Sequence, residues 1–519
     1  MSVVDNVIYA KQFGYGGVAP QLCTGLTMFQ DEESKTVTLK WGDPEDTYIN
    51  GILISSWAQT TILRKKGSYP TGIKDGTPIV VNKVRDQYAS DGYIDTITED
   101  GSVSDFYYMA FPAADTSSIS INENNRFTDT ELYEFVYDTS KADTENNVEY
   151  EGKSVNLVPA YMDYETGAFN YGSFKNAFFM SRPCMLDPDG NVAYYLNRDN
   201  MALREDGSLS EIADTSQSKN AMVEFKTIWF YCYQVGTKLH VKIANKRINE
   251  SYHAWMHYDR NGSILPAVYM AAYNGSLVNN KMRSLSGQPC MNNKTAQQEM
   301  SYAETNGDGW EPDLAVDRFC INLLLTLMGK GTDGQKIFGN GHYTGGSSAS
   351  DLLITGTMNS NGLFWGSNGT GKGVKVFGIE NYWGNQWRRL LGWINVSGTQ
   401  KIKMTYGTDD GSTVKGYNLT GSGYLTVASA TPGGTSGGYI SGVNIANGFG
   451  IIPVTASGSS STYLADGLWF NNSQTDIALV GGNCSNSLLC GPFCSALADT
   501  AAYAGWYFGA ALSYKKPVL

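Results

Sequence analysis

Beyond Gly329 the chain carries no apolar spacing of the helical kind. Gly, Ser, Asn, Thr and Tyr dominate this region, and short apolar runs interrupt them. A helix needs apolar residues three and four positions apart, whereas short apolar runs between turn residues are typical of strands. The whole chain of 519 residues contains 58 Gly and 33 Tyr. These features predict a mainly β protein with some α+β character and many loops.

The charge of the chain limits its class of partner. Acidic residues outnumber basic ones, which gives a formal net charge of -12. Proteins that bind nucleic acids concentrate Lys and Arg on one surface, so we expect no nucleic-acid partner. Hydrophobic residues make up 42% of the chain, which is enough to build large cores by burial alone.

The first residues, MSVVDNVIYAKQFGYGG, lack a basic segment followed by an apolar block. A secretory signal peptide has both, and a membrane-spanning helix needs about 20 apolar residues in a row. We therefore expect a protein that is made in a cytoplasm without a signal peptide and does not insert into a membrane.

Cysteine spacing argues against a zinc site. No two of the eight cysteines have the CxxC spacing of paired zinc ligands, and isolated cysteines are most often buried free thiols. The eight are Cys23, Cys184, Cys232, Cys290, Cys320, Cys484, Cys490 and Cys494. We expect free, mostly buried thiols, with no metal and no cofactor.

Short strands are indicated in the N-terminal part of the chain. Residues 35–41, KTVTLKW, alternate between polar and apolar side chains as a half-buried strand does. The runs WAQTTILRKK and FYYMAF have strand composition too, and Asp-Gly pairs mark turns. The pattern predicts a small β-sandwich over residues 33–122. An attachment segment at 1–32 would precede it, and an acidic linker at 123–148 would follow it.

Residues 149–519 form one large domain in this interpretation. Two strand-like runs, FKTIWFYCYQV and LHVKIA, come first. Two helices are predicted after them, over 294–305 and 312–328. Pro312 would lie near the first turn of the second helix, with Gly just past its end.

Three short motifs resemble functional sites, and each lacks an essential part. His253 and His257 are four residues apart, but the glutamate of the HExxH motif and a third ligand are missing. The segment 366–373, GSNGTGKG, departs from a phosphate-binding loop at Gly373, where a Ser or Thr should bind magnesium. The segment 187–191, DPDGN, begins like a calcium loop but lacks the bidentate glutamate. We expect structural histidines and two turns, and leave calcium binding open.

The loops near the C-terminus have the composition of a binding surface. Segments 479–493 and 504–512 combine glycines, which permit tight turns, with Asn and Ser, which offer adaptable hydrogen bonds. Tyr503, Trp506 and Tyr507 add rigid aromatic area, and antibody binding loops use the same mixture. The alternative interpretation is glycine-rich β-structure that packs its aromatic rings inward.

The N-terminal strands resemble a fibronectin type III module of the kind found in phage tail proteins. The shared features are VTLKW, TILRKKGSYP and the late strand FYYMAF. The resemblance covers the predicted sandwich at 33–122.

An ordered set of motifs runs through the C-terminal part of the chain. They are MRSLSG at 282–287, GDGW at 307–310, QKIFGNG at 335–341, FGIENYWGNQW at 377–387, VGGN at 480–483 and the closing YFGAALS. In this order they resemble a C-type-lectin-type domain, of the branch shared by sulfatase-modifying factors and phage tropism-determining proteins diversified by retroelements. The resemblance implies a C-type-lectin-like domain over 149–519, with its core at 280–519, two helices and long irregular loops.

The resemblance also implies roles for two groups of residues. The segment FGIENYWGNQW would be a structural loop, whose tryptophans hold an irregular backbone and whose carboxylate accepts hydrogen bonds from backbone donors. Its scaffold residues are Glu380, Asn381, Trp383 and Trp387. The implied receptor-binding residues lie after VGGN and in the loop 466–472, and they are Asn483, Ser485, Asn486, Ser487, Phe493, Tyr503, Trp506, Tyr507, Trp469 and Asn471.

Two activities of related domains fit the sequence poorly. Formylglycine-generating enzymes place two reactive cysteines soon after a GGS motif, but Cys484 and Cys490 have different offsets and Asn483 replaces the serine. Calcium-dependent lectins use Glu-Pro-Asn and Trp-Asn-Asp motifs. The nearest string here, WEPD at 310–313, lies between the predicted helices. We therefore expect no enzyme.

The resemblance implies a phage virion protein, part of a tail fibre or tail tip, that adsorbs to a host surface receptor, either a glycan or a protein. Other virion proteins would be its neighbours, and homo-oligomers such as trimers are common in such appendages. The alternatives are a structural virion component without receptor binding and, less favoured, a formylglycine-generating type of enzyme.

Overall fold

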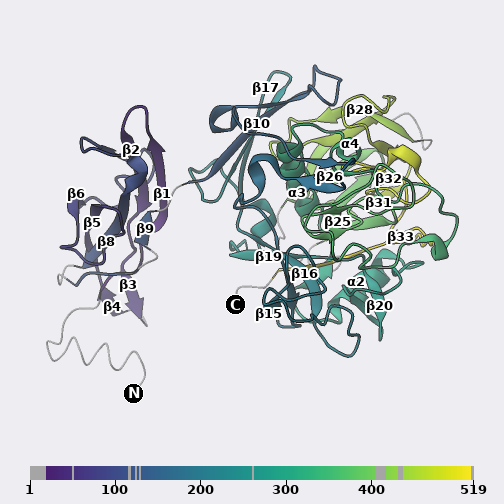
Figure 1. Ribbon diagram of the computed structural model, residues 1–519, viewed down its shortest axis with the longest axis horizontal. Coiled ribbons are helices and arrows are strands. Elements are labelled where there is room, and N and C mark those ends of the chain that lie inside the picture. Colours follow the sequence, from purple (N-terminus) through teal and green to yellow (C-terminus); the bar gives the residue numbers. More distant parts are fainter. Residues whose placement is uncertain are drawn as a thin grey trace. The chain divides into compact units, whose positions relative to one another are not determined.

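The computed structural model describes residues 19–49, 52–114, 118–122, 125–127, 130–259, 262–404, 417–429 and 437–515. The first 18 residues of the expected attachment segment lie outside these ranges. The chain divides into two compact units (Figure 1). Unit 1 comprises Met1–Glu131 and Ala244–Tyr252, and unit 2 comprises Leu132–Ile243 and His253–Leu519.

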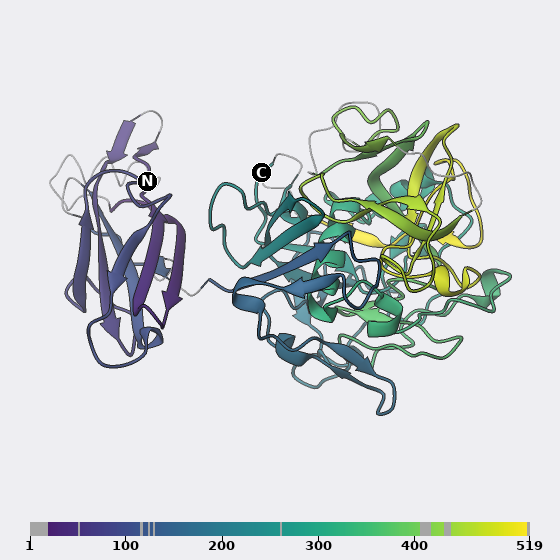
Figure 2. The ribbon, with the colours of Figure 1, turned by 90° about the horizontal axis from the view of Figure 1, so that it is seen from above.

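Unit 1 is a β-sandwich of two antiparallel sheets (Figure 2). The first sheet has the order β1 (Thr24–Asp31), β2 (Thr36–Gly42), β7 (Tyr93–Thr96). The second has the order β6 (Thr77–Asn82), β5 (Trp57–Lys66), β8 (Phe106–Ala114), β9 (Arg126–Phe127), and β3 (Thr47–Ile49) pairs with β4 (Ile52–Ser55). Trp41 of the first sheet meets Phe127 of the second edge to face, with ring centroids 6.0 Å apart. The two sheets therefore share one core.

The sandwich begins earlier than residue 33. Thr24–Asp31 is strand β1, which pairs antiparallel with β2. Its Met28 is buried in the same core as Leu39 and Trp41. This part of the expected attachment segment belongs to the sandwich, because its side chains complete the core.

The expected linker at 123–148 contains strands: Arg126–Phe127 is β9 of unit 1, and β11 of unit 2 begins at Val148. Leu132–Asp138 is strand β10 of unit 2, and Phe135 and Tyr137 are fully buried. Only the polar stretch after it, 139–147 with the sequence TSKADTENN, connects β10 to β11. The acidic composition of that stretch hid the strand before it.

The described residues of unit 2 form three larger sheets and three two-stranded ones. The four-stranded sheet has the order β11 (Val148–Tyr150), β10, β18 (Lys238–Ala244), β17 (Trp229–Val235). The six-stranded sheet has the order β15 (Val192–Tyr195), β14 (Arg182–Leu186), β16 (Asn220–Lys226), β19 (Ala267–Ala271), β34 (Leu512–Tyr514), β22 (Trp310–Pro312). The two-stranded sheets are β12 (Tyr161–Asp163) with β13 (Ala168–Asn170), β20 (Ser276–Val278) with β21 (Lys281–Arg283), and β23 (Lys375–Val376) with β24 (Ile379–Glu380).

The largest sheet of unit 2 carries the C-terminal loops. Its order is β27 (Leu425–Ser429), β26 (Thr399–Ile402), β25 (Trp387–Val396), β31 (Thr475–Val480), β32 (Ser495–Leu497), β30 (Gly467–Phe470), β28 (Gly438–Asn444), β29 (Ile452–Ala456). Strand β33 (Phe508–Gly509) pairs in parallel with the start of β25. The protein is thus mainly β, with few helices.

The described part of the chain contains three α-helices, α2 (Ala296–Glu304), α3 (Ala315–Gly329) and α4 (Gly334–Phe338). Helix α2 begins with a capping box, in which Thr295 Oγ1 accepts from Gln298 N and Gln298 Oε1 accepts from Thr295 N. None of the helices in these ranges combines the length and apolar character needed to cross a bilayer.

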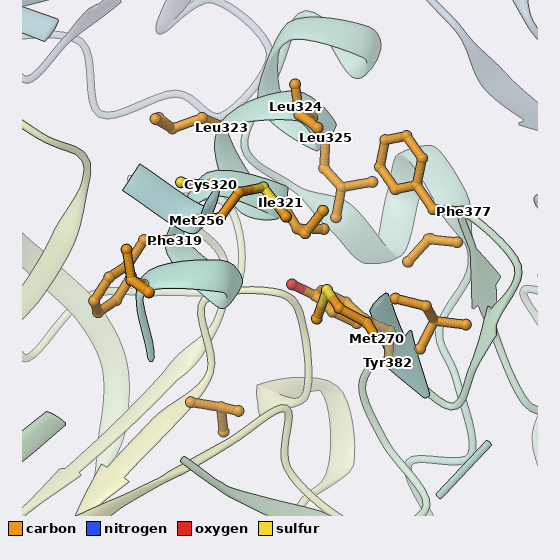
Figure 3. Close-up of a cluster of buried hydrophobic side chains, with 14 of the residues drawn as sticks. Met256, Met270, Phe319, Cys320, Ile321, Leu323, Leu324, Leu325, Phe377 and Tyr382 are labelled. Atoms are coloured by element: carbon orange, nitrogen blue, oxygen red, sulfur yellow. The ribbon is translucent and has the colours of Figure 1, made fainter. Parts of the chain in front are cut away.

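Helix α3 differs from its expected bounds. It begins at Ala315, because Pro312 lies in strand β22, opposite Leu512 of β34. Apart from Gly329 every residue of α3 is buried, and Figure 3 shows its apolar side chains among Met256, Met270, Phe377 and Tyr382. Most of these side chains are apolar, and the buried polar ones have partners, such as Asp317, which pairs with Lys515 at 2.8 Å. Helix α3 is the centre of the unit 2 core.

Candidate binding surface

The segment 377–387 is a buried loop that continues directly into β25. Trp383 is fully buried, and its Nε1 donates to the carbonyl oxygen of Gly339 at 3.0 Å. Phe377 and Asn381 have positive φ angles of 51°, a region that most side chains avoid. Asn381 N donates to the Val374 carbonyl oxygen at 2.7 Å. Tertiary contacts therefore hold this irregular backbone in place.

Glu380 connects the same loop to the 356–358 turn. Its carboxylate accepts from Gly356 N at 2.7 Å and from Met358 N at 2.9 Å. Lys375 Nζ donates to the Met358 carbonyl oxygen at 2.9 Å. Burial raises the pKa of Glu380, and burial lowers the pKa of Lys375 to about 8. The two side chains satisfy buried backbone groups of the turn, which would otherwise destabilise the fold.

Trp387 joins this buried loop to the molecular surface. It is buried in a small cluster with Leu479, Cys494 and Phe508. Trp469, which is only partly buried, packs on this cluster and meets Trp387 edge to face. The scaffold tryptophan thus supports a tryptophan that solvent can reach.

Three further aromatic residues continue from the same cluster. Tyr507 meets Phe508 with centroids 4.5 Å apart, and Trp506 meets Tyr507 edge to face at 5.4 Å. The Tyr503 and Tyr507 hydroxyl oxygens are 3.1 Å apart, and Tyr503 is 45% exposed. We call Trp469, Tyr503, Trp506 and Tyr507 the aromatic surface. Its side chains are partly exposed, yet each contacts another ring.

A buried ion pair anchors the backbone of the Tyr503 loop. Arg389 Nε donates to Glu299 Oε2 at 2.6 Å, and both side chains are at most 2% exposed. Arg389 Nη2 also donates to the carbonyl oxygens of Tyr503 at 3.1 Å and Lys294 at 3.3 Å. Burial raises the pKa of Glu299, although the Arg389 charge opposes the shift. The backbone of the loop is therefore tied to α2 and β25.

Two residues expected to bind a receptor are buried instead. Asn483 is 2% exposed, and its Oδ1 accepts from both Ser485 N and Ser485 Oγ at 2.8 Å. Phe493 is 6% exposed in the large core of unit 2, and its N donates to Asp466 Oδ2 at 2.7 Å. Asn483 shapes its own turn and Phe493 fills the core, so neither belongs to the surface.

The other expected polar residues lie at or near the surface. Ser485 and Ser487 are exposed, and Asn486 and Asn471 are half-buried. Trp506 packs on a cluster that contains Cys484, the residue before this serine turn. The 485–487 turn is therefore contiguous with the aromatic surface, and Ser485, Asn486 and Ser487 supply hydrogen-bonding groups beside the rings.

An apolar pocket of about 300 Å³ lies next to the Tyr503 loop, and no sequence motif indicated it. Its walls come from the start of α2, from β25, from the 417–424 turn and from the loop before Tyr503. They include Met300, Leu391, Tyr417, Tyr424 and Ala502. Because these residues are far apart in the sequence, only the fold brings them together.

The structure assigns the weak motifs to local structure. His257 is buried, its Nε2 is 3.2 Å from the Phe225 carbonyl oxygen, and burial lowers its pKa to about 3. The 187–191 segment is a turn in which Asn191 N donates to Asp187 Oδ1 at 2.8 Å. Within the described ranges, no group of three or more His, Cys, Asp and Glu side chains is placed to hold a metal ion.

All eight cysteines are buried free thiols. Burial raises the pKa of Cys484 to about 11, and it raises the pKa of Cys490 well above its usual value. A reactive cysteine needs the opposite shift, because the thiolate is the nucleophile. These two thiols lack the electrostatic surroundings that activate a cysteine.

The aromatic surface, the polar groups beside it and the apolar pocket together suit the recognition of a partner through direct contacts. Partly exposed rings are fixed on a buried frame, with serine and asparagine groups beside them and an apolar pocket at one flank. In sequence comparisons the chain matched no protein-family model and no curated protein.

Proposed function

We propose that this protein is a component of a phage virion appendage, a tail fibre or tail tip, and binds a host surface receptor through the aromatic surface and the adjoining 485–487 turn. The phage assignment rests on the motif resemblances in both parts of the chain. The receptor-binding role rests on one observation, that four partly exposed aromatic side chains stand on the buried Trp387 and Phe508 frame.

The chemistry of this surface favours recognition. Aromatic side chains with few rotatable bonds bury much area at a low entropic cost, and they dominate the energetics of many interfaces. The rings are already fixed by Trp387, Phe508 and one another, so binding orders little that was free before. Serine and asparagine groups next to the rings adapt to a partner's polar groups.

The proposed assembly multiplies weak single contacts. Several copies on one virion, for example in a homotrimer, would convert a modest affinity into firm adsorption. In this proposal the β-sandwich of unit 1 attaches the chain to other virion proteins, and unit 2 contacts the host.

A cell-binding assay tests the proposal. Purified full-length chain with a fluorescent label is mixed with a panel of bacterial strains, and cell-bound fluorescence is measured. Tyr503→Ala is the test variant, and Tyr161→Ala is its matched control. Tyr161 lies in β12, is not one of the four residues of the aromatic surface, and is 47% exposed against 45% for Tyr503.

We expect the wild type and Tyr161→Ala to bind the same strains and Tyr503→Ala to bind them about tenfold more weakly, the loss expected of an interface anchor. Equal binding by all three, or binding of the wild type to none of the strains, contradicts the proposal. Either result favours a purely structural role in the virion.

A further inference from the structure

A second pocket lies beside the 484–487 turn and has polar walls. Its volume is about 400 Å³, within the range of small-ligand sites. His342, Thr344, Gly345, Asp351, Thr370 and Gly371 line it. One wall comes from the 342–351 loop, and the other comes from the glycine-rich GSNGTGKG segment.

Backbone hydrogen bonds fix the glycine-rich wall. Trp365 and Lys375 exchange two backbone hydrogen bonds of 2.9 and 2.7 Å, so the segment between them is the loop of a hairpin. Asn340 N donates to the Ser367 carbonyl oxygen at 2.9 Å, and Asn340 Nδ2 donates to the Asn368 carbonyl oxygen at 3.0 Å. The glycine-rich loop that resembled a phosphate-binding motif is therefore hydrogen-bonded to Asn340, which precedes His342 by two residues.

His342 is the unusual residue of this pocket. Its side chain is only 8% exposed, and neither ring nitrogen has a hydrogen-bond partner among the described residues. Buried polar atoms without a partner are rare in native proteins and often mark a missing ligand or water. Burial lowers the pKa of His342. Both ring nitrogens have almost no accessible surface, so the groups that a ligand in the pocket reaches directly are those around the ring.

The other polar groups that line the pocket can form hydrogen bonds with hydroxyl groups of a ligand. Asp351 accepts from Ser347 N at 2.8 Å and Ser348 N at 2.9 Å, and these bonds lower the pKa of its carboxyl group. The pocket is thus lined by one carboxylate, a neutral imidazole and the hydroxyl groups of Thr344 and Thr370, with no cation. A phosphate would be repelled by the carboxylate, whereas hydroxyl groups can donate to it.

The pocket adjoins the aromatic surface. Gly346 N donates to the Cys484 carbonyl oxygen at 2.8 Å. Leu352, the neighbour of Asp351, packs with Cys484 in the cluster that supports Trp506. A ligand larger than the pocket would therefore extend toward Trp506 and its neighbouring rings.

We propose that this pocket binds one neutral sugar residue, through Asp351 and the hydroxyl groups of Thr344 and Thr370, and that the receptor is a glycan. The inference rests on the proposed function and narrows its receptor from glycan or protein to glycan. Sugar hydroxyls are donors and acceptors at once, as the pocket requires, and the rest of the chain of sugars would lie along the aromatic surface.

Saturation-transfer NMR and calorimetry with the full-length chain test this directly. The probes are glucose, galactose, mannose, rhamnose and N-acetylglucosamine, with inorganic phosphate as the anionic comparison. The test variant is Thr344→Val with Thr370→Val, which removes two hydroxyls at nearly constant volume. Its matched control is Thr166→Val, at an exposed threonine in the β12–β13 turn.

We expect at least one sugar to bind with a Kd of about 1 mM, and the double variant to bind it about fivefold more weakly for each lost hydrogen bond. The control keeps the wild-type affinity, and phosphate does not bind. Binding of phosphate alone, no binding of any sugar, or equal affinity of the double variant and the control overturns the inference.

A competition assay with unaltered protein does not depend on the folding of the variants. Free sugar at saturating concentration should reduce cell-bound fluorescence of the wild type. Cell binding that depends on Tyr503 but resists every sugar refutes the glycan inference and leaves receptor binding intact. Sugar binding in the pocket without binding to any strain refutes the proposed function and leaves the pocket assignment intact.

Discussion

Trp387 and Trp469 meet edge to face, with ring centroids 5.5 Å apart and ring planes at 87°. Trp387 is buried and Trp469 is partly exposed, so one ring belongs to the buried cluster and the other to the aromatic surface. Because of this contact, the position of the exposed Trp469 ring depends on the packing of the buried core. It also means that the two residues should respond differently to substitution.

Trp387→Ala should lower the free energy of unfolding by about 3–5 kcal/mol, the usual loss for a large buried aromatic residue. Trp469→Ala should lower it by only about 0.5–1.5 kcal/mol, the contribution of one aromatic pair, while it weakens cell binding. Urea unfolding followed by tryptophan fluorescence measures both. Equal losses of stability would show that Trp387 and Trp469 do not differ in their contributions to the free energy of unfolding.

Removing one partner of the Arg389–Glu299 pair should be strongly destabilising, because the other charge stays buried without a counter-ion. We expect Arg389→Met and Glu299→Met each to lower the free energy of unfolding by about 3–5 kcal/mol. The double variant should lose less than the sum of the two single losses.

The same variants should loosen the Tyr503 loop, since Arg389 donates to the Tyr503 carbonyl oxygen. Hydrogen exchange of the 501–507 amides should accelerate in Arg389→Met beyond the change seen at β10, which serves as the internal reference. Additive single losses in the double variant, or unchanged exchange at 501–507, would contradict this account of the loop.

Asp476 should make stability depend on pH in mildly acidic solution. Burial raises the pKa of Asp476 to about 6, and the nearby Asp499 adds to the shift, while Gln474 and Asn395 oppose it through hydrogen bonds. In the unfolded chain the pKa is about 3.9. The folded protein therefore holds a proton that the unfolded chain has released between these two values.

The sign follows from linkage. The contribution of Asp476 to stability is fully present below about pH 4 and is lost as the pH rises through about 6. Asp476→Asn cannot titrate, so the stability difference between variant and wild type should change across this range and be constant above pH 7. Denaturation curves at several pH values measure it, and a constant difference between pH 4 and 7 would refute the shifted pKa.

Cys484 and Cys490 should react slowly in the folded protein. Because burial raises the pKa of Cys484 to about 11, almost none of its thiol is ionised at pH 8. A disulfide reagent should label no thiol rapidly in native buffer and all eight cysteines in denaturant. Rapid labelling of Cys484 or Cys490 in the native state would revive the alternative of an enzyme with reactive cysteines.

The sequence indicated local structure well where short-range patterns decide it. The alternation of KTVTLKW corresponds to β2, and the helix expected over 294–305 corresponds to α2, Ala296–Glu304. Pro312 shows the limit of such patterns. A proline close to an apolar periodic run favours a helix start, but pairing with Leu512, far along the chain, places it in a strand.

The candidate site was predictable in composition but not in orientation. Tyr503 and Phe493 are both aromatic residues in glycine-rich loops, yet one is exposed and the other is in the core. Asn483 and Asn486 both carry an amide whose oxygen accepts hydrogen bonds within the same turn, yet Asn483 is buried and Asn486 is only half-buried. Which ring faces outward depends on long-range packing, and the polar pocket at His342 joins two loops that no local pattern connects.

Strand β34 has a consequence for biosynthesis. It lies between β19 and β22 in the six-stranded sheet, and Lys515 just after it forms a 2.8 Å ion pair with Asp317 in the core. While a ribosome is still making the chain, β19 and β22 have an empty place between them until residues 512–515 emerge. The six-stranded sheet can therefore be completed only after these residues have been translated. In nascent chains that stall earlier, the edges of β19 and β22 stay unpaired, so they are open to chaperone binding and aggregation.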